Sequence, residues 1–216
     1  MKEPYGKMAP EQGPCRGASV RTCGLRAATF LLAVLAQSLP QPPAEAQQPE
    51  SGNLPNEYTV KAVFLYSFGR YVEWPDSAFA NPSDPFVIGI VGEDPFGGTI
   101  DEIAAKKTIH DRRIVVQRFP SVEQYKPPCH ILFVSRSVAA DRQTALIEAT
   151  QGKTVLIVGE TSGFAERGAA ANFFVDGDRI RFEINADAAR RAYLHMDAKL
   201  LSLGKPVGTP PARGVN

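Results

Sequence analysis

Acidic residues follow two apolar runs of this chain, at positions where α/β proteins often bind ligands. Glu93, Asp94 and Phe96 come directly after the run at 86–91, and Glu160 follows the run at 154–158. In an open α/β sheet, ligands bind in the crevice beyond the carboxyl ends of the strands. If these two strands are parallel neighbours, both loops face one crevice, where a small ligand would contact Glu93, Glu160 and a nearby arginine.

The first of these loops is not a nucleotide-binding motif. Asp94 occupies the place where the pattern G-x-G-x-x-G needs its second glycine. Together with Glu93 it would also repel a phosphate. A plain strand-to-helix turn is the alternative at Gly92–Gly98.

No pattern in the sequence is typical of catalysis or of metal binding. His110, His130 and His195 occur singly, without the spacing of zinc ligands. The nucleophile motif G-x-S-x-G is absent. We therefore expect no catalytic residue, no metal site and no cofactor.

Candidate residues for contact with a partner lie at the end of an apolar helix. Residues 58–75 predict one helix, apolar on nearly every side, which ends at Trp74 because a proline follows. Such a helix is buried in the domain, against a partner or in a membrane. Its charged residues argue against a membrane span. Arg70, Tyr71 and Trp74 are the candidate partner-binding residues, and burial in the core is the alternative for Tyr71 and Trp74.

A charged strand provides a further candidate. Asp176-Gly177 predicts a hairpin turn before the strand at 179–184. Arginine and glutamate alternate there with apolar residues, so one face of the strand is charged. This face is either the solvated side of an edge hairpin or a contact surface for a partner that includes Arg181.

The first 46 residues have the order of a secretory signal peptide. Basic residues precede an apolar run at 27–36, which is followed by prolines and by the small-residue pattern Ala44-Glu45-Ala46. Five of the 24 basic and three of the 23 acidic residues lie in this leader, which leaves 19 and 20 and a net charge of −1. That balance offers no general reason to bind nucleic acid. Cys129 is the one cysteine outside the leader, and we expect a buried thiol there.

The remaining chain predicts a single layered α/β domain at 56–207, between loose segments at 47–55 and 208–216. The expected strands lie at 86–91, 113–119, 130–135, 154–158, 172–175 and 179–184, and the expected helices at 99–107 and 138–150. Alternation of strands and helices predicts a mostly parallel sheet with an antiparallel edge hairpin, flanked by helices. A final helix is expected at 185–203, capped by Asn185 and lying over the first helix. Its expected apolar stripe is Ala189, Tyr193, Met196, Leu200 and Leu203.

Three segments together resemble the YfiR family of exported bacterial domains. They are YTVKAVFLYSFGRYVEWP at 58–75, VIGIVGEDPFG at 87–97 and RIRFEINADAARRAYLHMDAKLLSL at 179–203. The resemblance implies a periplasmic domain without catalytic activity, whose best-understood relatives repress a membrane-anchored diguanylate cyclase by binding its periplasmic sensor portion. The chain departs from the pattern of this family in two respects. It has Gly168-Ala169 where relatives often have two adjacent glycines, and outside the leader it lacks a second cysteine for the disulfides that stiffen some relatives.

The sequence therefore favours a periplasmic regulator that does not itself span the membrane. Its expected partner is the sensor domain of an inner-membrane signalling protein. The sequence leaves open whether the protein also forms a homodimer. The alternative is an exported small-molecule binder, or a degenerate enzyme, that uses the loops after the buried strands. A purely structural role is a third alternative.

Overall fold

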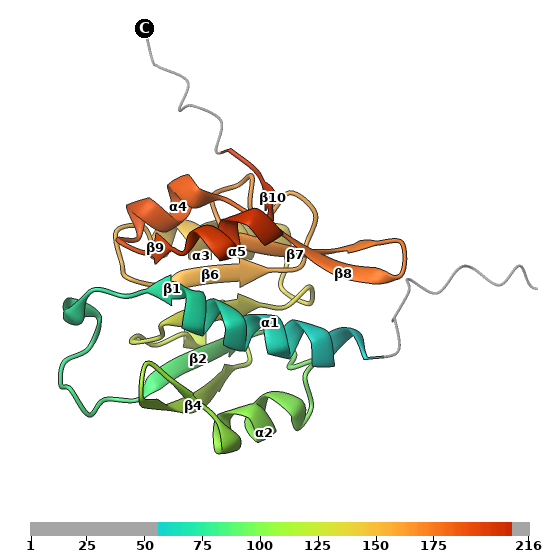
Figure 1. Cartoon of the computed structure of the whole chain (residues 1–216). Coiled ribbons are helices and arrows are strands. Elements are labelled where there is room, and N and C mark those ends of the chain that lie inside the picture. The colour runs from blue at the N-terminus through green and yellow to red at the C-terminus, as the bar shows by residue number, and fades with distance from the viewer. Residues whose placement is uncertain (1–55, 209–216) are drawn as a thin grey trace, which may run out of the picture. The chain divides into compact units, whose positions relative to one another are not determined.

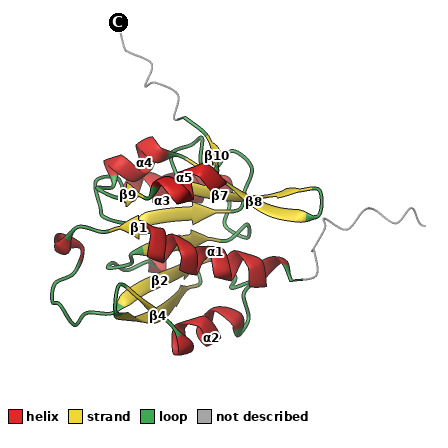
Figure 2. Ribbon diagram, viewed as in Figure 1, coloured by secondary structure: helices red, strands yellow, loops and turns green. Residues whose placement is uncertain are grey.

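The computed structural model describes residues 56–208, which contain a mixed eight-stranded sheet with helices on both faces (Figure 1). The strands of this sheet are β2 (Phe86–Val91), β3 (Thr108–Ile109), β4 (Arg112–Phe119), β5 (Ile131–Val134), β6 (Leu156–Gly159), β7 (Ala171–Asp176), β8 (Arg179–Ile184) and β10 (Lys205–Pro206). A two-stranded sheet pairs β1 (Val72–Glu73) with β9 (His195–Met196). The α-helices are α1 (Glu57–Tyr71), α2 (Thr99–Lys106), α3 (Ala140–Ala149), α4 (Ala186–Arg191) and α5 (Ala198–Leu203) (Figure 2).

The order of strands in the large sheet is β10-β8-β7-β6-β5-β2-β4-β3. Neighbours from β4 to β7 pair in parallel, whereas β8 is antiparallel to β7 and β3 is antiparallel to β4. This topology confirms the predicted fold class. The chain runs from β2 to β4 on one side and then crosses to β5 on the other, so the topological switch point lies between β2 and β5.

Two hydrophobic cores lie on the two faces of the sheet. β2 is buried at all six positions because helices cover both sides of it. Ile88 and Ile90 belong to the core shared with α1 and α2, whereas Val87 and Val91 belong to the core shared with α3. Cys129 is buried in the second core, as expected.

The first helix is shorter and less buried than predicted. α1 ends at Tyr71, and Val72 and Glu73 instead pair antiparallel with Met196 and His195 of β9. The predicted end at Trp74 is therefore wrong, because β pairing takes over before the proline can stop the helix. One side of α1 packs on the sheet (Figure 1), but Val60 and Val63 are 39% and 51% exposed.

The predicted final helix is divided into two. Asn185 precedes α4, and its side chain accepts a hydrogen bond from Ala188 N–H as expected of a cap. Tyr193 then adopts a left-handed conformation, with φ of 59°, and β9 follows before α5 begins. The expected stripe is broken for this reason: Tyr193 and Leu203 are exposed, whereas Met196 is buried.

Candidate functional site

Three buried charges and one half-exposed arginine meet at the carboxyl end of the parallel strands. Glu57 and Lys61 lie on the first turns of α1, Glu160 follows β6 directly, and Arg136 lies two residues after β5. The Lys61 ammonium contacts Glu57 and lies 2.5 Å from Glu160 Oε2. Arg136 Nη2 lies 2.7 Å from Glu57 Oε1 and 3.1 Å from Glu160 Oε2. This ion cluster ties the start of α1 to the loops after β5 and β6.

Tyr58 lies beside the ion cluster. Its hydroxyl donates to Glu160 Oε1 at 3.4 Å, and the Arg136 backbone N–H donates to the same oxygen at 3.0 Å. The Lys61 ammonium lies 4.6 Å from the centre of the Tyr58 ring, within the range of a cation–π contact. Burial raises the pKa of the Tyr58 hydroxyl, and the charge of Glu160 raises it further.

The electrostatic surroundings of Glu160 do not suit a general base. Burial acts to raise the pKa of the Glu160 carboxyl, but hydrogen bonds from Arg136 and Lys61 outweigh burial and hold the pKa below its usual value. Glu160 is therefore ionised near neutral pH with its oxygens engaged, whereas a general base needs a pKa near the working pH. The arrangement fixes the start of α1 against the loops after β5 and β6.

The structure does not bring the predicted loop residues into one crevice. β5 lies between β2 and β6, so these strands are not neighbours. Glu93 is exposed beside the switch point in a hollow of about 390 Å³, and its backbone N–H donates to Ser137 Oγ. Asp94 instead binds Arg118 Nε at 2.6 Å, and Phe96 packs edge-on against Phe133. Of the predicted loop residues, Glu160 alone belongs to the ion cluster.

The candidate partner-binding residues lie at two other places. Arg70 is exposed, with its guanidinium 6.0 Å from the Tyr66 ring, and Tyr71 is half-buried beside the Lys199 ammonium. Trp74 is also half-buried and packs edge-on against the ring of Phe86, with centres 4.9 Å apart. These three residues lie at or just beyond the end of α1.

The last candidate, Arg181, lies on the hairpin of β7 and β8. It is exposed, and its Nε lies 2.9 Å from Asp176 Oδ2 across the hairpin. The predicted site residues thus occupy four separate places: the ion cluster, the loop after β2, the end of α1 and the hairpin.

Sequence reasoning missed Glu57, Lys61 and Arg136 as members of one site. A signal was present, because Glu57 and Lys61 are spaced four apart in an otherwise apolar helix. Charges on a buried helix face need partners. Nothing in the sequence indicates that Arg136 is one of those partners, because that contact depends on strand order.

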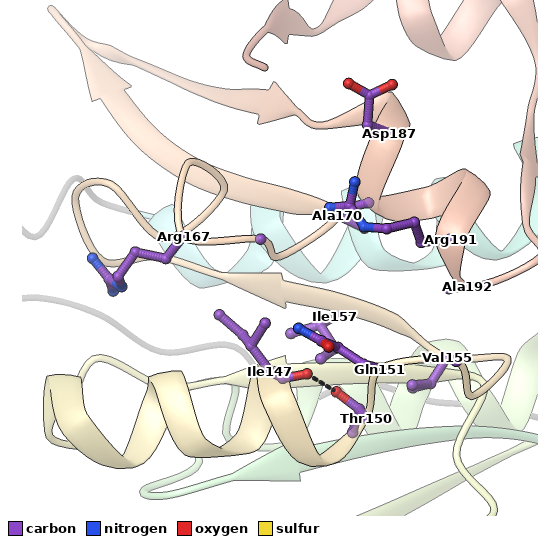
Figure 3. A pocket seen from close by; sticks show the side chains of 13 residues that line it. Ile147, Thr150, Gln151, Val155, Ile157, Arg167, Ala170, Asp187, Arg191 and Ala192 are labelled. Atoms are coloured by element: carbon purple, nitrogen blue, oxygen red, sulfur yellow. Dashed lines mark hydrogen bonds between the residues drawn. The ribbon is translucent and has the colours of Figure 1, made fainter. Parts of the chain in front are cut away.

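A cavity between α3, β6 and α4 was also missed (Figure 3). It has a volume of about 640 Å³, within the range of ligand pockets. Its lining is apolar at Ile147, Val155 and Ile157, and Arg191 of α4 extends over it. Small residues leave the space open: Gly152, Gly168, Ala170, Ala188 and Ala192.

Four of the exposed large apolar side chains belong to α1 and α5. Val60 and Val63 lie on α1, and Leu201 and Leu203 lie on α5, the helix whose Lys199 contacts Tyr71. Across residues 56–208 the structure contains no cluster of potential metal ligands. Within that same range, no helix has the length and apolar character required to cross a bilayer. The predicted leader at 1–46 lies outside the described residues.

Comparison with known proteins identifies one family. A family model described as YfiR/HmsC-like matches residues 58–205, which is more than half of the chain. The match includes most of α1, the ion cluster apart from Glu57, and all strands of the large sheet except the last residue of β10. No curated protein matches the chain.

Proposed function

Because this chain belongs to the YfiR/HmsC-like family of periplasmic, non-catalytic regulators of cyclic-di-GMP signalling, we propose that it represses a membrane-anchored signalling enzyme. It does so by binding the periplasmic sensor portion of that enzyme, which we take to be a diguanylate cyclase. Bound protein holds the enzyme inactive, and release frees it. Such a switch needs only a difference in affinity for two states of the partner.

The exposed apolar face of α1 is the observation that supports this proposal. Val63 is 51% exposed on a helix whose opposite side is fully buried at Ala62 and Leu65. Val60 lies three residues before Val63, on the same side of the helix, and is 39% exposed. Adjacent exposed apolar side chains are the kind of surface that proteins use to bind one another. The ion cluster holds the start of this helix in place, so the face is presented in a fixed orientation.

A binding measurement with the isolated sensor portion tests the proposal. The Val63→Asp variant places a charge on the exposed face, and we expect at least tenfold weaker binding because a desolvated charge at an interface is costly. Ala145→Asp is the matched control, since Ala145 is exposed on α3 at the opposite face of the sheet. The proposal fails if the wild-type protein does not bind the sensor portion, or if both variants bind as well as the wild type.

A second candidate function is small-molecule binding, and the cavity between α3 and α4 favours it (Figure 3). This function predicts a rise in melting temperature with a periplasmic metabolite. Ala192→Phe would fill the cavity and abolish the rise. If no compound in a metabolite panel stabilises the wild-type protein, this candidate is eliminated.

A further inference from the structure

The outer edge of β8 is only partly covered by another strand. β7 pairs with β8 along its whole length on one side. On the other side β10 pairs with Glu183 and Ile184 alone. No strand within residues 56–208 lies beside Arg179–Phe182 on that side. The uncovered stretch belongs to the hairpin that extends past the rest of the sheet (Figure 1).

The register of the hairpin shows which backbone groups face this edge. Asn185 N–H donates inward to the Ala170 carbonyl at 2.9 Å, whereas the Ile184 carbonyl accepts outward from Val207 N–H at 2.8 Å. Backbone groups of successive residues in a strand point to alternate sides. The N–H groups of Ile180 and Phe182 therefore point outward, and neither has a hydrogen-bond partner among the described residues.

An apolar groove adjoins the same stretch of β8. It has a volume of about 320 Å³ and lies between the start of α1 and the hairpin turn. Val60 and Phe64 line it from α1, and Ile180 lines it from β8. In a strand added beside β8, every second side chain would point towards this groove. The groove therefore accommodates an apolar side chain from such a strand.

The opposite face of the uncovered stretch is charged and carries two arginines. Arg179 and Arg181 alternate with Ile180 and Phe182, which pack towards α1, so the two arginines lie on the other face of the strand. Arg179 also lines the end of the groove at the hairpin turn. Both arginines are exposed. Arg181 Nε lies 2.9 Å from Asp176 Oδ2, whereas Arg179 Nε lies 3.8 Å from Asp178 Oδ1 and is therefore less closely paired. Cross-strand pairs of opposite charge stabilise neighbouring strands by about 0.2–1 kcal/mol each. Acidic side chains in an added strand would complement this face.

We propose that the uncovered edge of β8, from Arg179 to Phe182, binds an extended segment of the partner as an additional strand. In that segment apolar residues alternate with acidic residues. The apolar side chains point to the groove beside α1, and the acidic side chains point to Arg179 and Arg181. Main-chain hydrogen bonds supply affinity in this mode of recognition, and the alternating side chains supply specificity. This inference rests on the proposed function, since the segment belongs to the sensor portion.

Amide hydrogen exchange of the isotope-labelled protein tests the inference, with the isolated sensor portion as the probe. In the free protein the amides of Ile180 and Phe182 should exchange rapidly, whereas those of Arg181 and Glu183 are protected by β7. On binding we expect exchange at Ile180 and Phe182 to slow at least tenfold. Arg181 and Glu183 serve as internal controls in the same strand. If the sensor portion binds and the two outward amides stay unprotected, the edge-binding inference is overturned while the proposed function stands.

A variant pair gives an independent test. Ile180→Pro removes one outward N–H, a change that an edge strand can tolerate, and Ile180→Val keeps it. We expect at least tenfold weaker binding of the sensor portion by the proline variant and wild-type binding by the valine variant. Equal binding by a folded proline variant overturns the inference. If the proline variant does not fold, Arg181→Glu decides instead: binding at the wild-type level overturns the inference, and weaker binding supports it.

Discussion

Replacing Lys61 by methionine should destabilise the protein severely. The side chains of Lys61, Glu57 and Glu160 are only 1–2% exposed. Methionine has a similar volume, so the packing of α1 on the sheet would change little. What the variant loses is the one buried cation that contacts both carboxylates. Glu57 and Glu160 would then share only Arg136, which is 48% exposed.

The expected loss follows from the cost of leaving a buried charge without its partner. Breaking a buried ion pair by removing one member costs about 3–5 kcal/mol, because the remaining charge stays desolvated. Net folding free energies are about 5–15 kcal/mol. For a domain of this size, each kcal/mol lowers the melting temperature by about 2–4 °C. We therefore expect the variant to melt about 6–20 °C below the wild type.

Lys106→Met is the matched control, because Lys106 forms the same i,i+4 pair with Glu102 on a helix surface. That pair is about 70% exposed at both side chains, with a separation of 3.3 Å. Exposed helix pairs contribute about 0.3–0.5 kcal/mol. Urea unfolding at neutral pH should thus separate the two variants by several kcal/mol. Equal losses of stability in the two variants would refute the structural role assigned to the ion cluster.

Three further predictions concern single buried groups. His130 stacks on the rings of Phe79 and Phe86, and burial lowers the pKa of its imidazole from 6.5 to about 4. The folded state therefore favours the neutral imidazole. The contribution of this preference to the free energy of unfolding, about 3 kcal/mol, is complete above pH 6.5 and is lost as the pH falls towards 4. Urea midpoints measured between pH 7 and pH 4 should therefore fall less steeply for His130→Phe than for the wild type, and parallel curves would contradict this. Gly159→Ala would place a Cβ 2.1 Å from the Phe164 ring and should cost about 1–3 kcal/mol in unfolding free energy, whereas Gly98→Ala meets no atom within 4 Å and should cost far less. Burial raises the pKa of the Cys129 thiol to about 12, so alkylation by iodoacetamide at pH 8 should be slow until denaturant is added; rapid labelling of the native protein would show that the thiol is accessible.

The sequence predicted the layers of the fold well, because local patterns determine them. The apolar run at 86–91 and the turn at Asp176-Gly177 indicate a buried strand and a hairpin without reference to the rest of the chain. The end of α1 and the continuity of the final helix were predicted wrongly for the opposite reason. Val72 and Met196 are more than a hundred residues apart, and their pairing is not visible in either helix pattern.

The candidate site was harder to predict because it depends on strand order. Glu160 was recognised from its place after a buried strand, but its partners come from α1 and from the loop after β5. Insertion of β5 between β2 and β6 also separated Glu93 from Glu160. Side-chain identity indicated which residues carry charge, and only the topology determined which of them meet.

α1 is fixed at both ends by different interactions, and this arrangement bears on how the protein would bind. The ion cluster holds its first two turns, while the pairing of β1 with β9 holds the chain directly after its last residue. A helix held in this way loses little conformational freedom when its exposed face meets a partner, and pre-organised surfaces bind more tightly for that reason. Val60 adjoins both the exposed face and the groove beside β8. Contacts of a partner with α1 and with the edge of β8 would therefore form one continuous surface, whose two parts are positioned by the same helix.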